Sequence, residues 1–300
     1  MLAVGLECYD RAEMSAMQRL AGVPMSFSGE DRRRRMAAIW DTIGDDYGTV
    51  SPFLIETAEL LVEKASLREG ERVLDLGTGN GHGLVPAARA VAPARVVGVD
   101  ISDVMLTAAK RRADAAGLDN VELHNMDITA LRFPDATFDV ALASTVFQFV
   151  GYAPSALVEW HRVLVPDGRL LLSIPVSLGP PLEDLQQEFF VRLPISIQEA
   201  WVAGGAKPGL IQAPDLVELC TRAGFSNVQV EDIERRVTLE SVDAWWAFHW
   251  THGSRAFLAR LPTDALEDMR AEASHRLGPM LSPSGAVPMD TTMRVCRAVA

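Results

Sequence analysis

The stretch VLDLGTGNGHG, residues 73–83, joins a short apolar run to a turn in which every second residue is glycine. The apolar run predicts a buried strand, and Asp75 lies just before the turn. Glycine lacks a Cβ and tolerates positive φ, so a ligand can approach the backbone at Gly77, Gly79 and Gly81 closely. The stretch therefore predicts a strand that leads directly into a ligand-binding turn.

Short apolar runs alternate with helical segments from residue 70 to residue 176. The strand candidates are ERVLDLG, ARVVGVD, NVELHNMD, FDVALAS and GRLLLSIPV. The segments between them have helical patterns, and Ser102 is placed to cap the one that begins SDVML. This alternation predicts an α/β fold with a doubly wound, largely parallel sheet and right-handed crossovers.

The residues at the turn favour a cationic nucleoside ligand over a dinucleotide. The dinucleotide fingerprint needs a small residue where this chain has His82, and here the third glycine comes one residue early. The carboxylate of Asp75 would repel a pyrophosphate, but it suits a ligand that carries an ammonium group and no phosphate. S-adenosylmethionine has these properties, because an amino acid and a nucleoside flank its sulfonium.

The ends of the next strands supply groups for the rest of such a ligand. Asp100 ends VVGVD, where a carboxylate can bind both ribose hydroxyls. Asp127 can accept from an adenine amino group, with the backbone N–H of Ile128 facing a ring nitrogen. Further candidates are Ile101 and Met105 beside the adenine and the carbonyl of Ser144 beside the ammonium.

Each of these residues also has an ordinary structural interpretation. Asp75 and Asp127 could cap turns, and Met105 could pack its helix on the sheet. His82 could be a polar residue at a helix start, and Tyr47 could pack at the surface. The agreement of several strand ends favours ligand binding over these alternatives.

Together these motifs resemble those of class I S-adenosylmethionine-dependent methyltransferases, especially the ubiquinone/menaquinone-biosynthesis-like group that modifies small molecules. The matching pieces are VLDLGTGNG, VVGVDIS, NMDITALRFPDATFDVALAS and LVPDGRLLLS, in the family's order and spacing. The resemblance implies a seven-stranded Rossmann-like sheet with an antiparallel last strand. It assigns Asp75 and the turn with Thr78 to the methionine portion, Asp100 to ribose and Asp127 to adenine. It also implies an aromatic lid residue over the cofactor, for which Tyr47 is the candidate.

The sequence is expected to divide into four regions. Residues 1–66 are predicted to form an N-terminal helical lid, and residues 67–176 the cofactor-binding core. Residues 177–212, rich in proline and glycine, are predicted to be a cap insertion. Residues 213–300 are predicted to complete the sheet, with a helical cap insertion at about 241–278.

The composition supports a large core and argues against several kinds of partner. Of 300 residues 48% are hydrophobic, and the formal net charge of -12 disfavours a nucleic-acid partner. No apolar stretch reaches the ~18 residues of a membrane span. Cys8, Cys220 and Cys296 show neither metal-ligand spacing nor a disulfide framework. The start, MLAVGLECYD, is not typical of a secretory signal, so we expect a cytoplasmic monomer or homodimer without a metal.

Two histidines in a tryptophan-rich segment are the candidates for acid–base chemistry. In DAWWAFHWTHGSR, spacings of four and three place Trp245, His249 and His252 on one helix face. An oxygen or activated-carbon nucleophile has to lose a proton on methylation, and either histidine can accept it. The competing interpretation is a cap helix that packs on the core with polar residues at its rim.

The sequence therefore predicts methyl transfer from S-adenosylmethionine to an oxygen or activated carbon of a hydrophobic small molecule, in specialised-metabolite biosynthesis. The apolar and aromatic segments expected around the acceptor favour such a substrate over a protein or RNA. The main alternative is an enzyme that keeps the cofactor but catalyses a cyclisation or rearrangement. A non-catalytic binding subunit and a nicotinamide oxidoreductase are further alternatives, and Asp75 and His82 disfavour the latter.

Overall fold

The computed structural model describes residues 29–50, 52–150, 153–177 and 213–300, together with Gly179, Leu185 and Phe189. Residues 1–28 of the predicted lid lie outside the described residues. The same holds for the predicted cap insertion at 177–212, apart from Ser177 and the three single positions.

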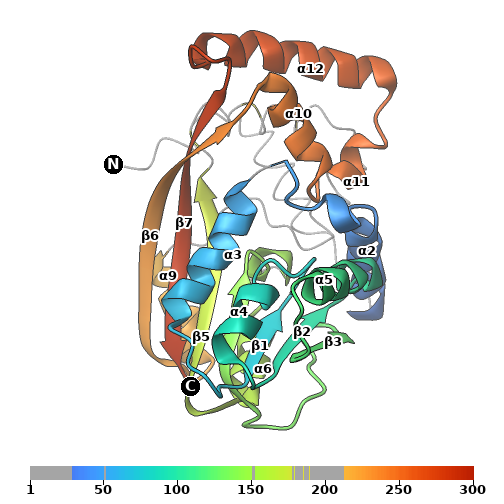
Figure 1. Ribbon diagram of the computed structural model, residues 1–300. Helices are drawn as coiled ribbons and strands as arrows, with labels where there is room; N and C mark the ends of the chain where they lie inside the picture. The colour runs from blue at the N-terminus through green and yellow to red at the C-terminus, as the bar shows by residue number, and fades with distance from the viewer. Residues whose placement is uncertain are drawn as a thin grey trace.

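A seven-stranded sheet forms the centre of the molecule (Figure 1). The strands are β1 (Val73–Leu76), β2 (Val96–Asp100), β3 (Val121–Asn125), β4 (Phe138–Ser144), β5 (Leu164–Ser177), β6 (Ser226–Leu239) and β7 (Val287–Val299). Their order is β3-β2-β1-β4-β5-β7-β6. Strands β1 to β5 pair in parallel, and β7 runs antiparallel to both of its neighbours. This confirms the predicted α/β class, including the antiparallel last strand.

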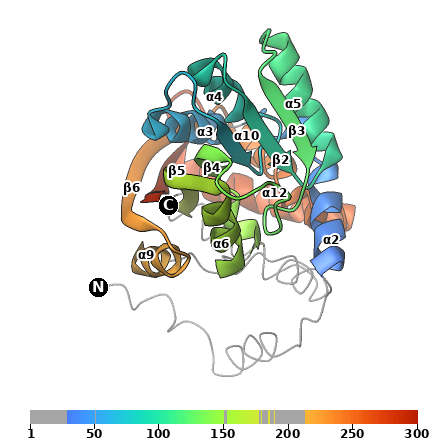
Figure 2. The same cartoon turned by 90° about the horizontal axis from the view of Figure 1, so that it is seen from below.

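Helices cover both faces of the sheet, which explains why its central strands are apolar throughout (Figure 2). The helices α3 (Pro52–Ala65), α4 (Leu84–Val91) and α5 (Asp103–Ala115) lie on one face. The helices α6 (Pro154–Val163) and α9 (Ala213–Arg222) lie on the other, where Trp160 and Cys220 are fully buried. Every residue of β1 and β2 is buried between these layers.

The beginning of α5 is fixed by a side-chain cap at the end of β2. As the sequence predicts, the hydroxyl of Ser102 accepts a hydrogen bond from the backbone N–H of Met105 at 3.1 Å. This cap places Asp100, Ile101 and Met105 next to one another at the carboxyl edge of the sheet.

A helical cap is built on the ends of the two outermost strands. The part of β7 before Thr292 pairs only with β6, so the two strands extend beyond the rest of the sheet as a ribbon (Figure 1). Between them lie α10 (Val242–Trp250), α11 (Arg255–Leu258), α12 (Thr263–Leu277) and a 3-10 helix, Gly278–Met280. These elements occupy the range in which the sequence predicts a helical insertion, and they enclose a second apolar core around Trp245.

Candidate cofactor and active site

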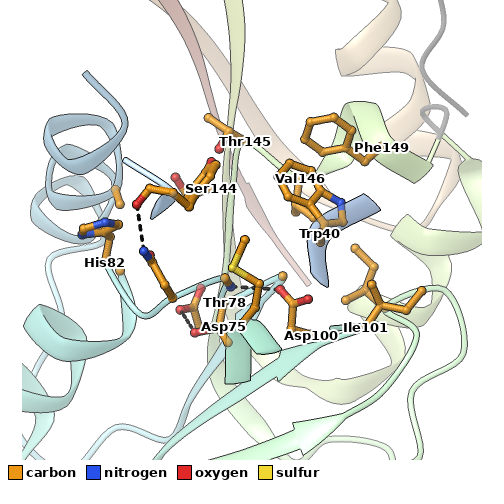
Figure 3. A pocket seen from close by; sticks show the side chains of 18 of the residues that line it. Trp40, Asp75, Thr78, His82, Asp100, Ile101, Ser144, Thr145, Val146 and Phe149 are labelled. Atoms are coloured by element: carbon orange, nitrogen blue, oxygen red, sulfur yellow. Dashed lines mark hydrogen bonds between the residues drawn. The ribbon is translucent and has the colours of Figure 1, made fainter. Parts of the chain in front are cut away.

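A cavity opens at the carboxyl ends of β1, β2 and β4 (Figure 3). Its empty volume, including the part open to solvent, is about 920 Å³, which is sufficient for a ligand the size of a nucleoside conjugate. The lid contributes side chains from α2 (Gly29–Asp41), from α3, and from the residue after the 3-10 helix η1 (Gly44–Asp46). All but one of the predicted cofactor residues line this cavity: Tyr47, Asp75, Gly77, Thr78, Gly79, Asp100, Ile101, Met105, Asp127, Ile128 and Ser144.

The glycines of the turn have two different roles. Gly77, Gly79 and Gly81 all have positive φ, which favours glycine at each position. Gly77 and Gly79 line the cavity, and no atom lies within 4 Å of the place where a Cβ on Gly79 would stand. Gly81 does not line the cavity. A Cβ there would lie 3.2 Å from the Cα of Ala109, so this glycine instead lets α5 pack close to the turn.

Asp75 is a buried carboxylate at the methionine end of the cavity. Its side chain is 3% exposed, and its Oδ2 accepts a hydrogen bond from the Thr78 hydroxyl at 2.7 Å. Burial, with a smaller contribution from the nearby charge of Asp100, raises the pKa of Asp75 to about 6. A cationic ligand would stabilise the ionised form, so the site fits an ammonium group.

Asp100 is oriented by the backbone of the turn and of α5. Its Oδ2 accepts from the N–H of Gly79 at 2.9 Å, and its Oδ1 accepts from the N–H of Ser102 at 3.0 Å. Burial raises the pKa of Asp100, whereas these hydrogen bonds oppose the shift. The carboxylate therefore has a fixed orientation at the cavity wall, as binding of a ribose diol requires.

The predicted adenine residues lie together beyond Asp100. Ile101, Met105, Asp127 and Ile128 line this part of the cavity. Asp127 also caps its own turn, because its Oδ1 accepts from the N–H and the hydroxyl of Thr129 at 2.9 and 2.8 Å. The two interpretations of Asp127, turn cap and cavity residue, are thus compatible.

The aromatic cover of the cavity includes a residue that the sequence reasoning missed. Trp40, at the end of α2, lines the cavity above Asp100 and Ile101 (Figure 3). Its ring makes edge contacts with Tyr47 and Phe149, with centroid distances of 5.8 and 4.9 Å. The available signal was an aromatic residue seven positions before Tyr47, at the end of a helical stretch in the same predicted lid.

Polar contacts attach α2 and η1 to the core. The Ser102 hydroxyl donates to Asp41, and Arg33 donates to Asn125. Arg111 of α5 forms an ion pair with Asp45 of η1. The contacts of Ser102 and Asn125 adjoin Asp100, so this part of the lid is attached near the ribose end of the cavity.

Tyr47 is held from both sides of the cavity. The side-chain amide of Asn80 donates to its backbone carbonyl at 2.8 Å, and a hydrogen bond joins the hydroxyls of Tyr47 and Thr145. Burial raises the pKa of Tyr47. Thr145 has φ +51, an unusual conformation for a β-branched residue, and it follows directly on β4 at the cavity wall.

Three histidines differ in their relation to the cofactor cavity. His82 lines it, whereas His249 and His252, the predicted proton acceptors, do not. His249 packs against Trp245 at 4.4 Å, and the ring of His252 lies 5.7 Å from that of Tyr47. Burial lowers the pKa of His249 to about 3 and that of His252 to about 4. The pKa of His82 is also lowered by burial, to about 4. The structure thus does not bring the two predicted histidines to the cofactor cavity itself.

Known proteins resemble this chain in sequence and in fold. Residues 67–213 match the family model described as a methyltransferase domain. Nocamycin O-methyltransferase of Saccharothrix syringae is 31% identical over 252 residues, which span 79% of this chain and 86% of the relative. Aklanonic acid methyltransferase of a Streptomyces species is 33% identical over 148 residues, 49% of this chain and 67% of the relative. The solved structure of the (4+2)-cyclase SpnF has a similar fold, with a TM-score of 0.53 and 21% identity over 82% of this chain and 80% of that one.

The fold and the cavity define a Rossmann-like enzyme that binds a nucleoside-type cofactor at its strand ends. The chain belongs to the class I S-adenosylmethionine-dependent methyltransferases that act on small molecules. S-adenosylmethionine is its cofactor, and the open backbone at Gly79 and the buried carboxylate of Asp75 fit that ligand.

Two further observations concern only the part of the chain that the structure describes. Within it, no helix combines the length and apolar character needed to cross a membrane. Nor do three or more histidine, cysteine, aspartate or glutamate side chains gather there in an arrangement suited to a metal ion.

Proposed function

We propose that this enzyme methylates an oxygen or an activated carbon of a hydrophobic small molecule in specialised metabolism. The observation that carries the proposal is the pair of buried carboxylates, Asp75 and Asp100, on either side of a turn with open backbone. The similarity to nocamycin O-methyltransferase supports oxygen as the acceptor atom. Apolar residues of the cavity wall, including Leu54, Ala58 and Val146, support a hydrophobic acceptor.

The residues of the chain act mainly by positioning. S-adenosylmethionine, when bound, supplies a methyl group that its sulfonium already activates. Asp75 would hold the ammonium and Asp100 the ribose, so the nucleoside and amino-acid ends are fixed on opposite sides of the turn. Good alignment of reacting groups can lower a barrier by roughly 7–11 kcal/mol. In the lid, Trp40 would exclude water from the reacting groups.

An acceptor hydroxyl also has to lose a proton, and we assign His252 to this step in preference to His249. The Nδ1 of His252 lies 2.6 Å from the carbonyl oxygen of Phe248, which can only accept. Nδ1 therefore carries the hydrogen, and in the neutral ring Nε2 has a free lone pair. Nε2 would accept the proton that the acceptor hydroxyl loses when it is methylated.

The state of the cysteines supports the proposed cytoplasmic location. Cys220 and Cys296 are fully buried free thiols whose Sγ atoms are 4.0 Å apart. Unpaired thiols are usual in proteins of a reducing compartment.

Mass spectrometry of a reaction with S-adenosylmethionine and a panel of phenols and β-dicarbonyl compounds tests the proposal. We expect one product that has gained a methyl group, together with equimolar S-adenosylhomocysteine. A product of unchanged mass, formed without S-adenosylhomocysteine, would instead identify the cyclisation or rearrangement alternative. The fold shared with SpnF, a (4+2)-cyclase, is the reason to look for that outcome.

A further inference from the structure

Unpartnered polar atoms gather around Tyr47. In the described part of the chain, five buried side-chain nitrogen or oxygen atoms have no hydrogen-bond partner: Asn80 Oδ1, His82 Nε2, Gln148 Oε1, His249 Nε2 and His252 Nε2. Leaving such an atom unsatisfied costs about 1–3 kcal/mol, so native structures rarely do so without a reason. A cluster of them indicates a place where a ligand or water completes the hydrogen bonds.

Four of these five residues are connected to Tyr47, to its neighbour Gly48 or to Thr145, and His249 is not. Asn80 donates to the carbonyl of Tyr47, and a Cβ on Gly48 would lie 3.0 Å from His82 Nε2. The amide of Gln148 donates to the carbonyl of Thr145 at 2.7 Å, and the Thr145 hydroxyl bonds that of Tyr47. The ring of His252, which lies two residues beyond the end of α10, packs on that of Tyr47, whereas His249 packs on Trp245 within the helix.

Tyr47 separates part of this cluster from the cofactor cavity. Tyr47 and Thr145 line the cavity, whereas Gln148 and His252, which contact them, do not. These two residues therefore form a polar layer behind the Tyr47–Thr145 wall. Thr145 follows directly on Ser144, the residue expected beside the methionine ammonium, so we place the layer near the methionine end of the cofactor site.

The hydrogen bonds that these side chains already make show whether their unpartnered atoms are donors or acceptors. The amide nitrogens of Gln148 and Asn80 donate to backbone carbonyls, which leaves their oxygens free to accept. His252 donates through Nδ1 to Phe248, which leaves Nε2 free to accept. Gln148 Oε1, Asn80 Oδ1 and His252 Nε2 are thus all acceptors. A ligand that pairs with them has to carry hydrogen-bond donors.

We propose that the polar layer behind Tyr47 is the docking site for the hydroxyl groups of the acceptor, with Gln148 as a specificity-determining residue beside His252. The proposal rests on the proposed function, because it takes the donor-bearing ligand to be the methyl acceptor. It narrows the substrate class to hydrophobic molecules with at least two hydroxyl groups, one facing His252 and the other facing Gln148. The acceptor reaches this layer when the ring of Tyr47 moves off Thr145.

Calorimetry on the enzyme loaded with S-adenosylhomocysteine tests the docking site, with a dihydroxynaphthalene and its dimethyl ether as probes. We expect the wild-type enzyme to bind the dihydroxy probe at least about tenfold more tightly, since capping the hydroxyls leaves buried acceptors unpaired. Gln148→Met should remove most of this preference, because it removes the acceptor oxygen at this position. Gln229→Met, the same exchange at an exposed site on β6, serves as the matched control.

Two results would overturn the inference: a wild-type enzyme that shows no preference between the probes, including one that binds neither, or a Gln148→Met variant that keeps the preference. If that variant no longer binds S-adenosylhomocysteine and so has not folded, His252→Phe is expected to reduce the preference, and an undiminished preference there would count against the site. Methyl transfer is a separate readout. Selective binding without transfer to any acceptor would contradict the proposed function and leave the docking site standing.

Discussion

At the scale of single residues, the turn after β1 offers a direct test of backbone approach by the cofactor. Gly79 and Gly117 both have positive φ, and neither has an atom within 4 Å of a substituted Cβ. Alanine at either position should therefore cost a similar amount of stability, roughly 1 kcal/mol. Only Gly79→Ala places a methyl group in the cofactor cavity, so we expect it to abolish S-adenosylhomocysteine binding in calorimetry while Gly117→Ala binds normally. Equal binding by both variants would show that the cofactor does not contact this backbone.

The raised pKa of Asp75 predicts a pH-dependent affinity for the cofactor. The ammonium group binds the ionised carboxylate, and burial places the pKa of Asp75 at about 6 in the free protein. Affinity for S-adenosylmethionine should thus be constant above pH 6 and fall by about tenfold per pH unit well below it. Titration calorimetry between pH 5 and pH 8 measures this profile. Asp75→Asn should bind more weakly at pH 8 and show a flat profile, and a wild-type slope in that variant would assign the titration elsewhere.

The sequence predicted the polar cofactor residues better than it predicted the aromatic ones. Asp75 and Asp100 directly end or follow apolar strands, so their place at the sheet edge follows from local pattern and parallel pairing. Trp40 comes to the same cavity only because α2 docks on α5, a tertiary contact with no local signature. The motif position of Gly81 predicted a ligand contact, but this glycine does not line the cavity, and a Cβ there would lie 3.2 Å from the Cα of Ala109.

At the scale of the elements, α2 should contribute to cofactor retention through Trp40. This ring lies over Asp100 and Ile101 and is supported by Tyr47 and Phe149 (Figure 3). Trp40→Ala removes this cover, and we expect the Kd for S-adenosylhomocysteine to rise by about tenfold, as calorimetry can show. Trp246→Ala, in α10, removes a tryptophan that does not line the cavity and should leave the Kd within about twofold. A similar rise in both variants would indicate general destabilisation in place of a specific cover.

The sequence distinguished helix from strand wherever the pattern of apolar residues extended over the whole element, as in β1, β2 and α5. The helical period of the α10 segment was equally clear, and it predicted His249 and His252 on one helix face, whereas α10 ends at Trp250 and His252 lies beyond it. The period did not predict the residues that this face contacts, because those contacts depend on how the β6–β7 ribbon positions the helix. The same pattern that suggested a pair of catalytic histidines therefore also fits two buried rings that pack against Trp245 and Tyr47.

At the scale of the whole molecule, the buried histidines predict a loss of stability in mild acid. His249 has a pKa of about 3 when folded and about 6.5 when exposed, so between these values the unfolded state binds more protons. Stability should therefore decrease as pH falls from 6.5 to 5, by on the order of 1 kcal/mol for this residue. Urea unfolding at the two pH values should show a smaller decrease for His249→Gln than for the wild type. His275→Gln, at an exposed position on α12, should leave the wild-type decrease unchanged. An unchanged decrease in the His249 variant would mean that its ring is not buried in neutral form.

The cap and the cofactor-binding sheet share two continuous strands, since β6 and β7 run from one into the other without a flexible linker. A cap that is attached through two continuous strands resists tilting relative to the sheet more than a cap on a flexible linker would. A change in the shape of the substrate would then be accommodated by substitution of individual side chains, while the position of the cap stays the same. Directed evolution toward new acceptors should accordingly succeed through substitutions of residues that line the cavity, such as Leu54 and Val146, while insertions in the ribbon would displace the whole cap at once.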